Sequence, residues 1–157
     1  MATQSEYELE TQLVNQLVGM HYELVNVTDE TSMKANLRKQ IELHNRLEAA
    51  HLTNSEFNRI FLHLTKGNEA IDRARILRDR YQLLRDDGTE KWLSFINKDE
   101  WCQNEFQVTR QVKQFNAEQN TRKTRFDVTL LINGLPLVQI ELKRRGLGLK
   151  EAFNQID

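Results

Sequence analysis

Apolar positions in the first part of the chain recur at the spacing of amphipathic helices. In "SEYELETQLVNQLVGM", leucines at positions 9, 13 and 17 share one face. Ser5 and Glu8 have the spacing of a capping box, and Gly19 favours an end to this helix. The pattern predicts helices over 5–19, 32–51 and 54–64, and a short alternating strand over 22–27.

From residue 81 onwards the pattern changes to the alternation typical of strands. "YQLLRDDGTEKWLSFI" (81–96) predicts a hairpin around Asp87-Gly88, and "NEFQVTRQVKQF" (104–115) predicts a strand. A polar connection (116–124), two further strands and a final helix beginning near Leu149 follow. That helix still shows its apolar period at Ile156, so we expect the natural chain to continue and this sequence to be a fragment.

The two further strands lie in "TRFDVTLLINGLPLVQIELKRRG" (124–146), and the length of their turn decides which residues share a face. A two-residue turn at Asn133-Gly134 would pair Asp127 with Ile140 and mix carboxylates with apolar groups on both faces. A loop with an odd number of residues, 132–134 or 133–135, places both carboxylates on one face and leaves the other face wholly apolar. We therefore expect the odd loop, with Gly134 in a left-handed conformation if the loop is 132–134.

In that register one face of the hairpin is wholly apolar, and the other, expected to be exposed, carries the charges. The apolar face comprises Phe126, Val128, Leu130, Val138, Ile140 and Leu142. The second face comprises Asp127, Thr129, Leu131, Leu137, Gln139, Glu141 and Lys143.

Asp127 and Glu141 then lie together near the open end of the hairpin, and Lys143 follows on the same face. Neighbouring carboxylates destabilise a strand pair unless something neutralises them. Mg²⁺ prefers such oxygen ligands, and a lysine beside it could position or deprotonate a water and offset charge on a phosphate. The residues alone also fit a solvated surface ladder of charges, so both interpretations stay open at this point.

Composition and charge limit the classes to which this protein can belong. The chain has 157 residues, of which 39% are hydrophobic and 29% charged, and this favours one soluble domain over residues 1–157. No membrane span, no secretory signal and no disulfide partner for Cys102 is expected, which indicates a reducing, cytoplasmic setting. Seven Lys and Arg against two acids between Arg122 and Lys150 fit either a polyanion site that holds a cation or a solvated rim on the hairpin, and charge alone does not exclude the second.

The run "RFDVTLLINGLPLVQIELKRRGLGLKEAFNQI" resembles the nuclease segment of type I restriction enzyme R subunits, within the PD-(D/E)xK superfamily. The Asp…Glu-x-Lys pattern falls on Asp127 and Glu141-Leu142-Lys143. The runs "NGLPLVQIELK" and "EAFNQI", with a weaker match at "SEYELE", go beyond the general superfamily pattern. The close match covers about residues 122–156, and Phe126 replaces the Pro of the superfamily label.

The resemblance implies roles for individual residues. Asp127 and Glu141 are expected to be metal ligands, with the carbonyl of Leu142 as a third, and Lys143 the catalytic lysine. Gln155 fits the Gln of a Gln-x-x-x-Tyr motif whose Tyr would lie beyond the chain. Glu6 and Glu10 are both candidates for an acidic residue contributed by the first helix, and neither is preferred. Candidate DNA phosphate contacts are Arg122, Lys123, Arg125, Arg144, Arg145 and Lys150.

The resemblance also implies a fold and a function. We expect an α/β (α+β) fold with a restriction-endonuclease-like core, in which helices flank a mixed sheet and the first helix packs near the 125–143 hairpin. The expected activity is that of a type I site-specific deoxyribonuclease: Mg²⁺-dependent cleavage of double-stranded DNA. The specificity and methyltransferase subunits would be partners of the full-length chain.

Two alternative functions stay open, and one type of ATP site is excluded. The alternatives are another PD-(D/E)xK nuclease of repair or recombination, and a docking domain for DNA or the motor that has no chemistry. The sequence has no phosphate-binding G-x-x-x-x-G-K-[ST] loop. ATP would therefore bind only to motor domains of the parent protein.

Overall fold

The computed structural model describes residues 5–47, 49–67, 69–113 and 125–143, without the side chains of Lys113 and Arg125. The described chain forms two compact units. The first, here called the sheet unit, contains the residues up to Glu30 together with 106–131 and 136 onwards. The second, the helix unit, contains Thr31–Glu105 and the hairpin tip Ile132–Leu135. One domain over 1–157 stays a prediction.

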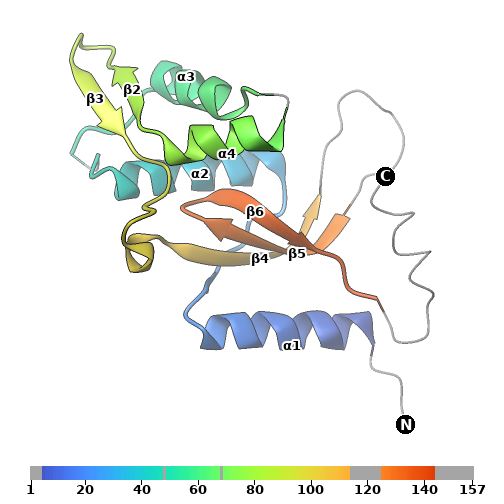
Figure 1. Ribbon diagram of the computed structural model, residues 1–157. Helices are drawn as coiled ribbons and strands as arrows, with labels where there is room; N and C mark the ends of the chain where they lie inside the picture. Colours follow the sequence, from blue (N-terminus) through green and yellow to red (C-terminus); the bar gives the residue numbers. More distant parts are fainter. Residues whose placement is uncertain (1–4, 48, 68, 114–124, 144–157) are drawn as a thin grey trace, which may run out of the picture. The chain divides into compact units, whose positions relative to one another are not determined.

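The sheet unit is built on a four-stranded sheet in the order β1-β4-β5-β6 (Figure 1). β1 pairs with β4 in parallel, whereas β5 and β6 are joined by a tight turn and are therefore antiparallel. The mixed sheet with helices confirms the expected α+β class. The elements of this part are α1 (Glu6–Gly19), β1 (Glu23–Leu24), β4 (Phe106–Lys113), β5 (Arg125–Ile132) and β6 (Leu135–Ile140).

Helix α1 begins with the capping box that the sequence predicts. The Ser5 side chain accepts a hydrogen bond from Glu8 N, and the Glu8 carboxylate accepts one from Ser5 N at 2.8 Å. Fully buried Val14 packs with Val108 of β4 and Val128 of β5. The expectation that the first helix packs on the hairpin is confirmed, and Figure 1 shows α1 running beside these strands.

The turn between β5 and β6 corrects the expected odd loop. It contains only Asn133 and Gly134, with φ angles of 49° and 78°, as in a type I′ turn. The physical reason lies in Asn133, whose side-chain amide donates to Phe95 O at 2.9 Å and whose Oδ1 accepts from Glu105 N at 2.8 Å. Asn133 makes those bonds with its backbone in the left-handed region, which Asn tolerates.

The separation of apolar from charged residues is nevertheless present near the open end of the hairpin. Leu130, Ile140 and Leu142 all pack against the cluster that contains Val128. The structure thus combines the tight turn with part of the expected apolar face, whereas Val138 of that face is 46% exposed. It differs in length, because β6 ends at Ile140 and residues 141–143 continue as irregular chain.

The second face of the hairpin is not the exposed surface that the sequence predicts. Thr129 and Leu131 of β5 are fully buried, and Asp127 is half-buried. A polar hydroxyl and a charge on a covered face need partners or a function. The Thr129 hydroxyl has no hydrogen-bond partner within the described residues.

The helix unit holds its own core of aliphatic and aromatic side chains, centred on Ile41, Ile60 and Phe95. Its helix α4 is absent from the sequence predictions; it is a short helix in which no residue is fully buried, although Leu77 packs against the core. The strand expected over 22–27 is reduced to the two residues of β1, and the helix expected over 32–51 ends earlier. The elements of this unit are α2 (Glu30–His44), α3 (Asn54–Leu64), α4 (Ala70–Arg78), β2 (Tyr81–Leu84), β3 (Glu90–Leu93) and η1 (Trp101–Gln103).

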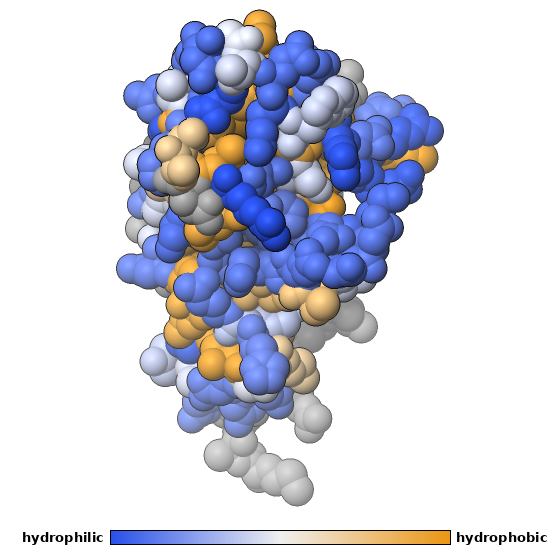
Figure 2. Space-filling model, turned by 90° about the vertical axis from the view of Figure 1, so that its left-hand side faces the viewer, coloured by the Kyte–Doolittle hydropathy of each residue, from blue (hydrophilic) through white to orange (hydrophobic). Residues whose placement is uncertain are grey.

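Figure 2 shows a face on which hydrophilic side chains predominate, with hydrophobic patches between them. In the part of the chain that the structure describes, no helix is long and apolar enough to cross a membrane.

Candidate active site

The site is built where the open end of the β5–β6 hairpin brings two distant stretches of sequence together. Asp127 lies on β5, and its Oδ2 accepts a hydrogen bond from the backbone N–H of Leu142 at 2.8 Å. This bond ties the carboxylate to the irregular segment that directly follows β6. Because Glu141 and Lys143 flank Leu142, all three charged residues of the motif lie in one place.

Lys143 is the positive centre of this cluster. Its Nζ donates a hydrogen bond to Glu141 Oε1 at 3.0 Å, and each of the two side chains is 26% exposed. This hydrogen bond raises the pKa of Lys143 above its ordinary value. Burial acts in the opposite direction, whereas the negative charges of Glu141, Glu6 and Asp127 raise the pKa further. The ammonium group is therefore held in its charged form.

The two acidic candidates of the first helix lie in different surroundings. Glu6, in the first turn of α1, acts electrostatically on Lys143. Glu10 is only 4% exposed, and its carboxylate accepts a hydrogen bond from Gln111 Nε2 and lies 4.0 Å from Arg110 Nε. The charge of Glu6 therefore acts on the motif lysine, whereas Glu10 contacts a buried polar cluster on β4.

Sequence reasoning missed Arg110 and Gln111, which form that cluster. Gln111 has a φ of 58°, which is unusual for a residue in a strand, and this backbone accompanies a side chain that reaches Glu10. One signal was available for Glu10 itself, because it precedes Val14 by four residues and so lies on the buried stripe of α1. Nothing in the local sequence indicates the left-handed conformation of Gln111.

The donor groups at the open end suit a hard cation. Two carboxylates, from Asp127 and Glu141, and the main-chain carbonyl of Leu142 are oxygen ligands of the kind that Mg²⁺ binds. Within the described ranges, no group of three or more His, Cys, Asp or Glu side chains could hold a metal ion. A two-carboxylate set is still sufficient for Mg²⁺, which usually keeps several waters and takes one or two carboxylates.

Several expected site residues lie outside the described residues. They are Gln155 and the candidate phosphate contacts Arg122, Lys123, Arg144, Arg145 and Lys150. Arg125 belongs to β5 by its backbone, but its side chain is not described. Their roles remain predictions.

Comparison with known proteins extends over the whole chain. Residues 3–157 match the family described as type I restriction enzyme R protein N terminus. The endonuclease subunit of type I restriction enzyme SauMSSORF170P from Staphylococcus aureus (strain MSSA476) is 49% identical over 158 residues, which cover 99% of this chain. The endonuclease subunit of EcoprrI from Escherichia coli is 36% identical over 156 residues.

The chain is much shorter than these relatives. It spans 16% of the length of the Staphylococcus aureus protein and 48% of that of the Escherichia coli protein. The match nevertheless includes the hairpin, α1 and the helix unit alike. The chain belongs to the family of type I restriction enzyme R proteins, of which it matches the N terminus.

Proposed function

We propose that this chain is the nuclease part of a type I restriction enzyme R subunit and that it cleaves double-stranded DNA with a divalent cation. The observation that carries the proposal is the meeting of Asp127, Glu141 and Lys143 at the open end of the β5–β6 hairpin. The relatives are named as endonuclease subunits, which supports the same reaction class.

The proposed ligands of the cation are the carboxylates of Asp127 and Glu141 and the carbonyl oxygen of Leu142. Mg²⁺ is the ion that this oxygen set fits best. When bound, it would supply the Lewis-acid polarisation that hydrolysis of a phosphodiester requires. Lys143 now occupies one oxygen of Glu141, so its ammonium neutralises that carboxylate in the structure described here.

The chain's own residues have two tasks in this reaction. The Lys143 ammonium has three N–H donors, one of which binds Glu141, so two remain to hold the attacking water or a phosphate oxygen. The carboxylate of Asp127 accepts a hydrogen bond from the N–H of Leu142, and this bond holds the segment that carries Glu141 and Lys143 next to β5. Fixed donors and charges of this kind lower the barrier because they do not reorganise during the reaction.

The net reaction is a hydrolysis. The oxygen of water attacks phosphorus, and the bond from phosphorus to one sugar oxygen breaks. That sugar oxygen takes up a proton, and the water loses one, so the products are a phosphomonoester and a free hydroxyl group. Cleavage of both strands requires this reaction on each strand.

Within the proposal, other components belong to the parent protein and its complex. ATP hydrolysis, sequence recognition and methylation would be carried out by motor domains and by the specificity and methyltransferase subunits. Gln155 would complete the site from the segment after the hairpin. The alternatives remain another PD-(D/E)xK nuclease and a docking domain without catalysis.

The decisive experiment replaces Lys143 by Ala in the intact subunit, assembled with its partners, and measures DNA cleavage and ATP hydrolysis together. Loss of cleavage with unchanged ATP hydrolysis is expected. Lys91→Ala is the matched control, because Lys91 is an exposed lysine on β3 of the helix unit. Unchanged cleavage in the Lys143 variant would show that the charged cluster is not the site.

A calorimetric titration separates nuclease from docking domain. Mn²⁺ is added to the protein and to its Asp127→Ala variant. Heat of binding that disappears in the variant is expected for a nuclease, whereas identical titrations would favour the docking alternative.

A further inference from the structure

We propose that Arg46, Arg78 and Arg80 of the helix unit bind backbone phosphates of double-stranded DNA, in addition to the site on the hairpin. The choice of DNA as the polyanion rests on the proposed function. The choice of surface rests on a pocket in the helix unit and on the exposure of the three guanidinium groups that line it.

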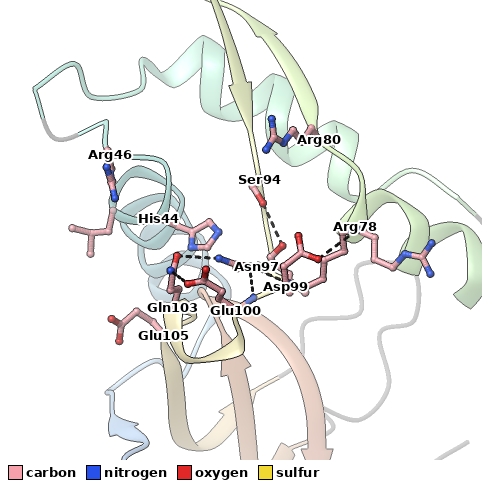
Figure 3. A pocket seen from close by; sticks show the side chains of 13 residues that line it. His44, Arg46, Arg78, Arg80, Ser94, Asn97, Asp99, Glu100, Gln103 and Glu105 are labelled. Atoms are coloured by element: carbon pink, nitrogen blue, oxygen red, sulfur yellow. Dashed lines mark hydrogen bonds and ion pairs between the residues drawn. The ribbon is translucent and has the colours of Figure 1, made fainter.

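The pocket is an open, polar hollow of about 760 Å³. Its wall is formed by the end of α2 with Arg46 just after it, by Arg78 at the end of α4 with Arg80 beyond it, and by residues of the segment 94–105. Figure 3 shows Arg46 on one side of the hollow and Arg78 and Arg80 on the other, with the polar side chains of Asn97 and Gln103 between them. The spread of the arginines over the rim suits an extended ligand with several anionic groups.

The three guanidinium groups are exposed, and none makes an ion pair or hydrogen bond with the residues that the structure describes. Other arginines of the same unit are engaged. Arg59 pairs with Asp86 at 2.9 Å, and Arg85 with Glu56 at 2.8 Å. Arginine presents a planar fork of donors that fits phosphate oxygens, so unpaired forks around one hollow favour a phosphate-bearing ligand.

The acidic side chains of the pocket lie along one segment. Asp99 is 3.9 Å from Lys98, and Glu100 accepts a hydrogen bond from Gln103. Glu105 also lines this part of the hollow. Phosphates would be repelled from that segment, so a DNA strand would follow the arginines on the rim of the hollow.

The backbone of Arg46 supports a use for its side chain. Helix α2 ends in a Schellman motif, in which Leu47 N donates to Glu42 O at 2.8 Å and Arg46 N donates to Leu43 O at 3.1 Å. Arg46 occupies the left-handed position of that motif, with a φ of 55°. Glycine adopts this conformation without steric cost, so an arginine in this position is consistent with a role for its side chain.

The test measures binding of a fluorescein-labelled DNA duplex of about 30 base pairs and arbitrary sequence at a series of NaCl concentrations. EDTA is present, so cleavage and cation binding do not contribute. The R46A/R78A/R80A variant is compared with wild type and with K39A/K66A/K91A, which removes three exposed charges elsewhere in the same unit. Circular dichroism melting checks that each variant is folded.

The expected result is a weaker complex for the arginine variant and a shallower salt dependence. The slope of log K against log [NaCl] should change by about 2.7, which is about 0.9 for each of three lost phosphate contacts. The lysine control should change it much less. Equal changes in the two triple variants, or no change in the arginine variant, would overturn the proposal.

One further variant separates binding from folding, and the assay conditions separate binding from catalysis. Arg46→Gly should raise the Tm, because the strained position is relieved, and yet weaken DNA binding; a higher Tm with unchanged binding would overturn the role of Arg46. Because EDTA is present, the binding assay does not depend on the cation that the proposed nuclease would use. Failure of the proposed nuclease activity would therefore appear in cleavage assays and leave this binding test unaffected.

Discussion

The backbone N–H of Leu142 donates to Oδ2 of Asp127 at 2.8 Å, across 15 positions of sequence. This bond fixes the carboxylate of one strand to the segment that carries Glu141 and Lys143 on the other side of the hairpin. The same atoms thus serve the fold and the proposed site. Substitutions at Asp127 should separate these two contributions.

Asp127→Ala should lower the free energy of unfolding by about 1–2 kcal/mol, because a partly buried N–H loses its acceptor. Asp127→Asn retains an oxygen acceptor and should unfold within about 0.5 kcal/mol of wild type. Both variants should lose DNA cleavage. Urea unfolding and a cleavage assay on the intact subunit measure the two effects, and an Asn variant as unstable as the Ala variant would contradict the role of this hydrogen bond.

Glu141→Gln should abolish cleavage and leave the fold in place. The pair with Lys143 is partly exposed, so its loss should cost at most about 1 kcal/mol. The amide keeps the shape of the side chain and one oxygen for Lys143. Thermal melting checks the fold, and a sharp fall in Tm would mean that the pair is mainly structural. Full cleavage by a folded variant would exclude Glu141 from the site.

The sequence predicted α1 and its capping box from local spacing and one apolar stripe, and the resemblance implied the packing of this helix near the hairpin. It failed at the hairpin turn. The register argument weighed only which side chains share a face, whereas the turn is also held by hydrogen bonds from Asn133 to residues almost 30 and 40 positions away. Contacts of that range have no trace in the local pattern.

The site shows the same division. The grouping of Asp127, Glu141 and Lys143 was predictable, but the register argument for it was wrong: the hydrogen bond from Leu142 N to Asp127 brings them together, in an irregular segment after β6. The choice between Glu6 and Glu10 was not, because it depends on how α1 is rotated against β4. The partners of Glu10 could not be predicted either, because they require the left-handed backbone of Gln111.

Glu6→Ala and Glu10→Ala should therefore have opposite effects: the first mainly on the cleavage rate, the second mainly on stability. Removing Glu10 leaves Arg110 and Gln111 without their partner in a covered position, and should lower the free energy of unfolding by about 2–3 kcal/mol. Removing Glu6, in the first turn of the helix, should cost at most about 1 kcal/mol and should change the cleavage rate through its charge near Lys143. Urea unfolding measures the loss of stability of each variant, and a cleavage assay measures its rate. A large loss of stability in Glu6→Ala, with an altered cleavage rate only in Glu10→Ala, would contradict these assignments.

Three glycines form a matched series for the hairpin tip. A Cβ at Gly134 would lie 2.8 Å from Leu37 Cα, in addition to the strain of a φ of 78°, so Gly134→Ala should cost about 3 kcal/mol or more. Gly88 has a φ of 84° and no atom within 4 Å, so Gly88→Ala should cost only about 1 kcal/mol. Gly19→Ala meets nothing and should stabilise the helix by up to about 1 kcal/mol. Equal losses at positions 134 and 88, measured by urea unfolding, would show that the close approach to Leu37 is absent in solution.

Glu56 should make the stability of the protein depend on pH. The carboxylate is 1% exposed, and burial alone would raise its pKa. Hydrogen bonds from Thr53 N, Asp86 N and Arg85, together with the charge of Arg85, lower the pKa below its ordinary value. Because the folded pKa is the lower one, this stabilisation is complete above the unfolded pKa of about 4.3 and is lost as the pH falls through the folded pKa.

Wild type should accordingly melt at a lower temperature as the pH falls below about 4. Glu56→Gln should be less stable than wild type at pH near 7, and the difference in Tm should narrow in acid, because the variant has no proton to take up at this position. Glu90→Gln is the control, since Glu90 is an exposed carboxylate of β3 whose loss should leave the acid profile as in wild type. A constant difference in Tm between wild type and Glu56→Gln from neutral pH to strong acid would show that Glu56 does not titrate with unfolding.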